Sequence, residues 1–341
     1  MNKSRSGLIF GVFALFVVAA FAASAPSYHI LKTWTLGGDG GWDYLKIDSD
    51  ARRLYISRAT RVMVINSDSG EKIGEIADTP GVHGIALVPE IGKGFTSNGR
   101  EDTVSVFDLN TLKTLNKIKV GKNPDAIWYD SATKRIFTFN GASHDATAID
   151  AAKGEVVGTI PLGGKPEFAQ SDGRGTVFVN LEDKNELFAI DANKLVVREH
   201  WPLPNCDEPS GLAMDLKKRR LYVGCGNKVM PVVNADDGKV IAMIPIGDGV
   251  DATAFDEETG LAFASCGEGV LTVAREESPG KYSAENIPTQ KGARTMALDS
   301  KTHRVYTVTA KFGPPPAPTA TNAHPRPVVL PDSFVVLMLG Q

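Results

Sequence analysis

The chain has 341 residues, of which 42% are hydrophobic and 23% are charged, and its formal net charge is −3 at pH 7. This composition can bury a sizeable core, which excludes an intrinsically disordered chain. A mildly acidic balance without a Lys/Arg run also argues against sequence-independent nucleic-acid binding, because such binding needs a cationic face.

The first residues have the pattern of a secretory signal peptide. Lys3 and Arg5 form a short positive segment, residues 8–21 are uncharged and apolar, and the triplet AFA that ends at residue 22 fits the small-x-small cleavage rule. A retained membrane anchor is the alternative, but the run is short for a span of about 20 residues. We therefore expect a signal peptide over 1–22, no membrane insertion after cleavage, and a periplasmic or secreted mature chain.

A repeated pattern accounts for the rest of the chain. An Asp is followed seven residues later by Tyr or Phe in five places, the spacing is six at Asp172, and Pro89 once replaces the Asp. The aligned positions are residues 48, 89, 130, 172, 215, 256 and 299. A period near 40 residues with strand-type alternation is typical of propeller blades rather than helical repeats.

Each unit is predicted to form four short strands. In the first unit these strands lie at 43–48, 54–57, 62–66 and 71–76. Polar turns such as DSDARR and NSDSGEK separate them, and Gly- or Pro-marked loops precede each inner strand. The sequence therefore predicts an all-β protein built from four-stranded antiparallel blades.

The two ends of the chain are expected to share the last blade. The last unit supplies only three predicted strands, at 294–299, 304–309 and 333–339. A Pro-rich insertion over 311–332 delays the third of them, and a spare strand stands at 28–36. Pairing the spare strand with the last one closes the ring and removes an exposed sheet edge. We predict one seven-bladed β-propeller domain over 23–341, closed by its N-terminal strand.

Three cysteines occur, and none of them forms a C-x-x-C motif, so a redox motif, a zinc knuckle and covalent haem are unsupported. Cys225 and Cys266 end equivalent strands of adjacent blades. Packed sheets lie about 10 Å apart, beyond the Cα separation of about 7 Å that a disulfide tolerates. Cys206 precedes the inner strand that pairs with the strand of Cys225. We predict a Cys206–Cys225 disulfide, with Cys266 free and buried.

The inner strands begin at the mouth of the axial channel. Five residues before each aligned position stand Asp43, Gly84, Asp125, Glu167, Ser210, Asp251 and Arg294. Either the carboxylates accept backbone N–H bonds that tie the blades together, or they form a site for a cation or a polar ligand. In the second case Arg294 can bind a carboxylate or phosphate. The candidate ligands of calcium or magnesium are Asp43, Asp125, Glu167 and Asp251.

Three more residues are candidates for the same site. His83 adjoins the mouth position of the second blade, His144 follows a strand of the third blade, and Trp42 precedes Asp43. The simpler alternatives are solvated loop histidines and a packing role for Trp42. The chain has no G-x-S-x-G, H-E-x-x-H, P-loop or G-x-G-x-x-G motif, so no catalytic residue is assigned.

The Asp-to-aromatic spacing, the segments RRLYIS and RRLYVG, and strand ends such as VIN and AID resemble the YVTN β-propeller family. Exported YncE-like seven-bladed propellers are the nearest kind, and the resemblance covers all seven units. The chain departs from the pattern at GKGFTSN, where Phe replaces Tyr, and in the last insertion. Such propellers include binding proteins, surface-layer components, lactonases, lyases and quinoprotein subunits.

The resemblance implies an exported, monomeric binding or scaffold protein that holds a small molecule or a protein at its loop face and channel mouth. The alternative is a lactonase- or lyase-like enzyme with a divalent cation at the same mouth. A quinoprotein-like electron carrier is less consistent with the sequence, because no haem motif and no redox-type C-x-x-C pair is present to carry electrons. Binding and catalysis would use the same residues, so both remain open at this point.

Overall fold

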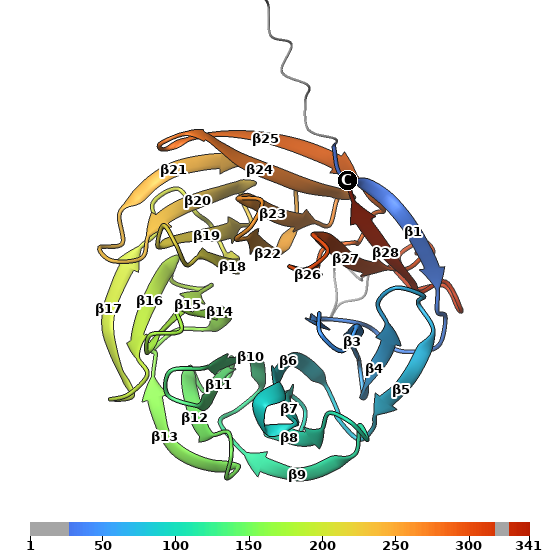
Figure 1. Ribbon diagram of the computed structural model, residues 1–341, viewed down its shortest axis with the longest axis horizontal. Helices are drawn as coiled ribbons and strands as arrows, with labels where there is room; N and C mark the ends of the chain where they lie inside the picture. Colours follow the sequence, from blue (N-terminus) through green and yellow to red (C-terminus); the bar gives the residue numbers. More distant parts are fainter. Residues whose placement is uncertain (1–26, 318–326) are drawn as a thin grey trace, which may run out of the picture.

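Residues 27–317 and 327–341 of the chain are described by a computed structural model, and the expected signal peptide lies outside them. These residues form seven separate four-stranded antiparallel sheets, arranged as blades around a central channel (Figure 1). The all-β, seven-bladed propeller is thereby confirmed. A single 3-10 turn, Pro89–Ile91, is the one helical element of the described residues. None of the described segments is a helix with the length and apolarity that crossing a membrane requires.

In each of the first six blades, four consecutive strands are hydrogen-bonded in chain order from the channel outward. Blades one and two are β2 (Leu45–Asp48), β3 (Arg53–Arg58), β4 (Arg61–Asn66), β5 (Lys72–Ile76), β6 (Val82–Val88), β7 (Lys93–Asn98), β8 (Thr103–Asp108) and β9 (Thr114–Lys119). Blades three and four are β10 (Pro124–Asp130), β11 (Arg135–Asn140), β12 (Asp145–Asp150), β13 (Glu155–Pro161), β14 (Pro166–Ser171), β15 (Thr176–Leu181), β16 (Glu186–Asp191) and β17 (Val196–Pro202). Blades five and six are β18 (Pro209–Asp215), β19 (Arg220–Cys225), β20 (Val229–Asn234), β21 (Val240–Pro245), β22 (Val250–Asp256), β23 (Leu261–Cys266), β24 (Val270–Ser278) and β25 (Lys281–Pro288).

The seventh blade joins the two ends of the chain. Its strands, from the channel outward, are β26 (Met296–Asp299), β27 (Arg304–Thr309), β28 (Val335–Gly340) and β1 (His29–Thr35). β1 runs antiparallel to β28, with His29 opposite Gly340 and Thr35 opposite Val335 (Figure 1). The predicted closure by the N-terminal strand is therefore confirmed.

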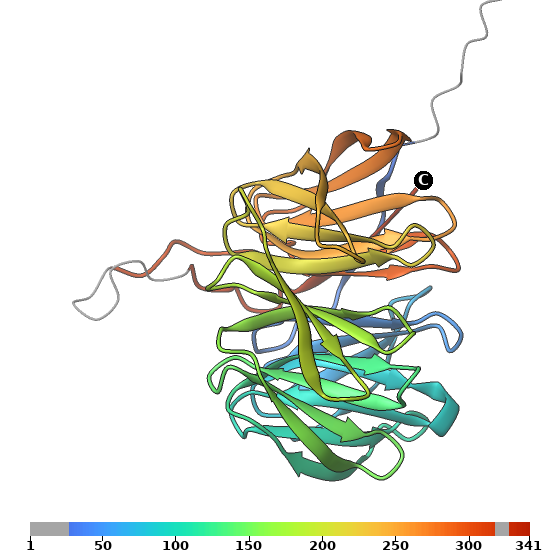
Figure 2. The same ribbon diagram turned by 90° about the vertical axis from the view of Figure 1, so that its left-hand side faces the viewer.

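The starts of two inner strands were predicted too early. β2 begins at Leu45 and β26 at Met296, two residues later than predicted, because the chain leaves the ladder as it approaches the channel mouth. The insertion between β27 and β28 starts with an isolated antiparallel bridge between Phe312 and Val329. Its described part projects away from the disc (Figure 2).

The aromatic residue of each repeat is part of the core between blades. These side chains are at most 2% exposed in all seven units: Tyr55, Phe95, Phe137, Phe178, Tyr222, Phe263 and Tyr306. The Tyr306 hydroxyl of blade seven donates a hydrogen bond to the Ser67 carbonyl of blade one, at 3.0 Å. The repeated aromatic residue is thus explained by packing between blades.

The repeated Asp caps a turn and ties neighbouring blades together. Asp299 accepts a hydrogen bond from the Lys301 N–H, and its other oxygen lies 2.5 Å from Nη1 of Arg52 in the next blade. Three more aligned aspartates contact the next blade in the same sense, in the pairs Asp130–Ser171, Asp172–Arg219 and Asp256–His303. On this face the repeated Asp-to-aromatic spacing therefore has a structural role.

The structure contains a disulfide between Cys206 and Cys225, whose Cα atoms are 5.3 Å apart. Cys206 lies in the loop before β18, and Cys225 ends β19, which is paired with β18 at Pro209. Cys266 is free and fully buried, and burial raises the pKa of its thiol to about 11.

Deleting residues 27–36 should destabilise the propeller strongly. The deletion exposes the β28 edge and removes Tyr28, which is 4% exposed and packs edge-on against Phe263. The loss should be on the order of 5 kcal/mol, so the melting temperature should fall by roughly 10 °C or more, or the protein should aggregate. Calorimetry against a chain that starts at residue 27 is the measurement. Equal melting of the two chains would contradict closure by β1.

Thiol counting should find no reactive cysteine in the native protein. Unfolding without reductant should expose one thiol, that of Cys266, and unfolding with reductant should expose three. The reason is that Cys206 and Cys225 are bonded to each other and Cys266 is buried. Three thiols titrated in denaturant alone would refute the disulfide.

Candidate functional site

Five inner strands carry a register shift where they reach the channel mouth. The shifts lie between Val82 and Ile85, Pro124 and Ile127, Pro166 and Ala169, Pro209 and Leu212, and Val250 and Ala252. Each interval includes a predicted mouth position. A β-bulge bends its strand and redirects a side chain, so these bulges set the orientation of the mouth residues.

In blade two the mouth side chain belongs to His83. A Cβ on the neighbouring Gly84 would lie 2.9 Å from the Ile127 nitrogen and 3.0 Å from the Asp125 carbonyl oxygen. Only glycine fits there without a shift of the next blade, and this close approach brings His83 near Asp125.

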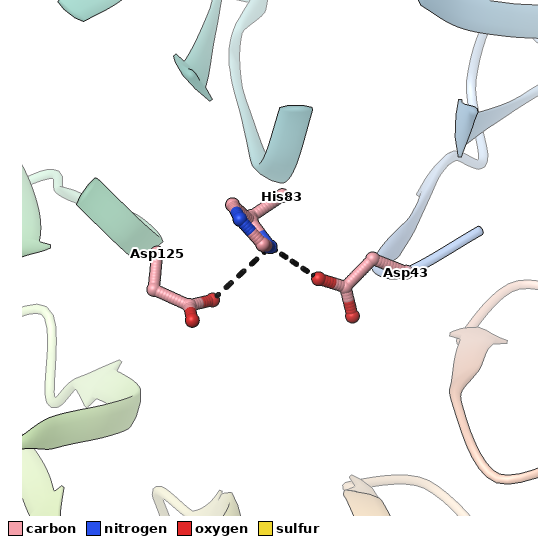
Figure 3. A group of neighbouring side chains, drawn as sticks. All are labelled: Asp43, His83 and Asp125. Atoms are coloured by element: carbon pink, nitrogen blue, oxygen red, sulfur yellow. Dashed lines mark hydrogen bonds and ion pairs between the residues drawn. The ribbon is translucent and has the colours of Figure 1, made fainter. Parts of the chain in front are cut away.

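Asp43, His83 and Asp125 form a cluster on three successive blades (Figure 3). Nδ1 of His83 is 2.5 Å from Oδ2 of Asp43 and 3.8 Å from Oδ1 of Asp125. One ligand atom from each residue lies within 4.8 Å of the other two. This nitrogen and these two carboxylate oxygens suit a divalent cation.

The loop that leads to Asp43 is held by a buried arginine. Arg58 is 0% exposed, and its guanidinium donates to the carbonyls of Gly38, Asp39 and Gly40 at 3.0 to 3.2 Å. It also lies over the Phe334 ring, 3.7 Å from the centroid. Burial lowers the pKa of Arg58 to about 10. The glycine-rich loop between β1 and β2 therefore has a fixed path into the mouth.

Side chains of the second strand in four blades hold the mouth backbone in place. Hydroxyls of Ser57, Ser97 and Ser265 donate to the carbonyls of His83, Asp125 and Arg294 in the next blade, and the Asn180 amide donates to Ser210. Within residues 27–317 and 327–341, no backbone N–H donates to the four mouth carboxylates. The blades are thus tied through carbonyls rather than through the carboxylates, and Oδ2 of Asp43 is hydrogen-bonded to His83. Oδ1 of Asp125 and Oε2 of Glu167 are buried without a hydrogen-bond partner in this part of the chain.

Burial and the charges of neighbouring groups raise the pKa values of four side chains at the mouth. Burial alone would lower the pKa of His83, but the hydrogen bond to Asp43 and the charges of Asp125 and Glu167 raise it to about 9. Burial and carboxylate neighbours raise the pKa of Asp125 to about 6, of Asp251 to about 7 and of Glu167 to about 9, against the charges of His83, Arg294 and Lys165. Raised carboxyl pKa values in a concave site are typical of functional sites.

Two aromatic side chains form the floor of the mouth. Tyr44 of blade one and Phe168 of blade four stack across the channel, with ring centroids 4.6 Å apart and planes inclined by 27°. The Tyr44 hydroxyl is buried without a hydrogen-bond partner in the described chain, and burial together with four neighbouring carboxylates raises its pKa well above the usual value. The sequence interpretation missed both residues. The sequence feature that could have indicated them is that each is an aromatic residue directly after a predicted mouth carboxylate.

The remaining predicted residues lie outside the cluster of three. Oε2 of Glu167 is 3.7 Å from Nζ of Lys165, and Oδ2 of Asp251 is 3.9 Å from Nε of the half-exposed Arg294. His144 is exposed on the turn between β11 and β12 and is not brought to the cluster. Trp42 packs against Phe334 and Phe312, with centroids 5.2 and 6.1 Å away, as the packing alternative expected.

Comparison with known proteins supports the fold alone. No family model matches the chain, and no curated protein matches it. Solved structures with the same fold include Kuenenia stuttgartiensis hydrazine synthase, with TM-score 0.70 and 18% identity over 78% of this chain and 92% of that chain. The RRP9 WD40 repeats match with TM-score 0.73 and 9% identity over 92% and 97% of the two chains, and U3-55K with 0.72 and 9% over 91% and 98%. The chain is thus similar in structure to WD40 β-propellers.

Without bound cations, the protein should lose stability as the pH rises from 5.5 to 9.5. His83 has a folded pKa of about 9 against 6.5. Its contribution to the free energy of unfolding is complete below pH 6.5 and is lost as the pH rises through 9. Glu167 and Asp251 also have raised folded pKa values, about 9 and 7, so the native state binds their protons more tightly and stability again falls as the pH rises. Urea unfolding of chelator-treated protein measures this slope.

Glu167→Gln should flatten that slope, because glutamine imitates the protonated carboxyl at every pH. The expected gain at pH 9.5 is on the order of a few kcal/mol relative to the unmutated protein. Glu258→Gln, at a side chain that is 80% exposed, is the matched control and should leave the slope unchanged. Identical slopes for all three proteins would show that Glu167 carries no raised pKa.

Proposed function

We propose that this chain is an exported YVTN-type propeller that binds other molecules through its channel mouth, where Asp43, His83 and Asp125 hold a divalent cation. The observation that carries the proposal is the convergence of three ligand atoms within 4.8 Å of one another. Oxygen ligands favour calcium or magnesium, and the imidazole extends the choice to manganese or zinc.

The state of the neighbouring groups supports a cation at this position. Asp125 and Glu167 each keep a buried oxygen without a hydrogen-bond partner in the described chain. Burying such an oxygen costs free energy unless a ligand satisfies it. Without a cation, His83 places its own positive charge between two carboxylates. A metal ion would replace the Nδ1 proton, so its affinity should increase with pH.

The surroundings of the cluster indicate what the bound cation would present. Asp43, His83 and Asp125 are 17 to 29% exposed, so the ion would keep positions open toward the loop face. The guanidinium of Arg294, 49% exposed, offers a second cationic group on the same rim. A small anionic molecule, or a carboxylate of a protein partner, could contact both the bound cation and the Arg294 guanidinium. The Cys206–Cys225 disulfide supports export, since disulfides persist in oxidising compartments.

A metal-assisted lactone hydrolase or lyase is the second candidate. The observation that favours it is the raised pKa of Asp251, about 7, near the cluster. Carboxyls that titrate near neutral pH can serve as general acids or bases, and a cation can polarise a lactone carbonyl. A panel of lactones tested on metal-loaded protein separates this activity from binding alone.

Calorimetric titration with calcium, magnesium, manganese and zinc should detect one cation per chain. His83→Gln should weaken binding roughly 100-fold, because one of three ligands is lost. His144→Gln is the matched control, since this histidine lies on the same face outside the cluster, and it should bind as the unmutated protein does.

The proposal fails if the chelator-treated, unmutated protein binds none of the four ions. It also fails if His83→Gln and His144→Gln bind equally well. Asp43→Asn provides an independent check, because it keeps the shape of the side chain and removes a ligand charge.

A further inference from the structure

The channel continues below the stack of Tyr44 and Phe168 as an apolar cavity of about 240 Å³. Its walls include Leu45, Ile47, Ile85, Ile127, Leu212 and Met214. The cavity extends to Ser300, in the turn after β26. It therefore reaches toward the face opposite the acidic mouth.

One cation, Lys46, lines this cavity. Its Nζ lies 4.6 Å from the centroid of the Trp128 ring. Lys46 and Trp128 also line an adjoining cavity of about 140 Å³, together with Ile85, Leu87 and Tyr129. Burial lowers the pKa of Lys46. The ammonium group is therefore placed among apolar and aromatic side chains.

Lys46 has no counter-ion in the described chain. No carboxylate of these residues lies within ion-pair distance of its Nζ, and the aspartates that end the inner strands are used elsewhere. Asp48 accepts the N–H groups of Asp50 and Ala51, and Asp299 pairs with Arg52. A cation–π contact is worth about 0.5 to 2 kcal/mol, and the half-buried ammonium group of Lys46 has lost part of its hydration without gaining an anion in return. The site lacks an anion.

We propose that the lower channel binds a small organic anion with an apolar body, such as an aromatic or short aliphatic carboxylate. The carboxylate would contact Nζ of Lys46, and the apolar body would fill the space beside Trp128 and the aliphatic walls. The cavity has the volume of roughly eight water molecules, which suits a molecule of the size of benzoate. Gln170 adds an amide to the lining for a second polar contact.

This site is separate from the mouth. Tyr44 and Phe168 stack across the channel between the two, and the carboxylates next to them repel an anion. Access is therefore from the face where Ser300 lies. The proposal does not depend on a cation at Asp43, His83 and Asp125, and His83→Gln should bind the organic anion normally.

Calorimetric titration of the folded protein with benzoate and hexanoate should show saturable binding of one molecule per chain. Benzyl alcohol, which lacks the charge, and phosphate, which lacks the apolar body, should bind at least 10-fold more weakly. Lys46→Met keeps the length and apolar volume of the side chain and should weaken benzoate binding by roughly 10- to 100-fold. Lys239→Met, at a side chain that is 81% exposed, is the matched control and should change nothing.

Two results would overturn the proposal: no saturable binding of either carboxylate, or equal benzoate affinity in Lys46→Met and the unmutated protein. If Lys46→Met does not fold, the unmutated protein decides the question. Reductive ¹³C-methylation of its lysines should then give one resonance that shifts with benzoate and not with benzyl alcohol. Absence of such a resonance would also refute the proposal.

Discussion

The ladder between β1 and β28 is the interaction on which the ring depends, because it joins residues from opposite ends of the chain. Its effect extends to the mouth. The chain runs from β1 through the glycine-rich loop, which Arg58 holds, directly to Asp43. The strand that closes the ring therefore also positions the first carboxylate of the mouth. A ring without this ladder would bring no blade-one carboxylate to His83.

The two faces of the propeller use their polar groups differently. On the turn face, aligned aspartates such as Asp256 and Asp299 are consumed by turn capping and by contacts to the next blade. At the mouth, hydroxyls such as those of Ser57 and Ser97 hold the backbone carbonyls instead. The hydrogen bonds that stabilise the mouth backbone therefore do not involve the carboxylates. The carboxylates are left free of backbone hydrogen bonds, and burial together with repulsion between them raises the pKa values of Glu167 and Asp251.

Blade number, strand order and closure were predictable from the sequence because each depends on a local pattern repeated seven times. The mouth positions were predictable by the same counting, and so was the cysteine pair. Which of those positions meet was not predictable. A bulge at Val82 to Ile85 and the missing Cβ of Gly84 bring His83 to Asp43 and Asp125. The contact of Tyr44 with Phe168 crosses the ring between non-adjacent blades, so no sequence spacing encodes it. His144 shares the face with His83, but its exposed turn leaves it outside the cluster.

The stack of Tyr44 on Phe168 places two aromatic rings across the axis of this propeller. A solute that moves along the axis from one face to the other would therefore have to pass these two rings. The two halves of the axis differ in charge, since carboxylates line one half and Lys46 the other. A single fold thus has two chemically unlike surfaces along one axis, on either side of the same pair of rings.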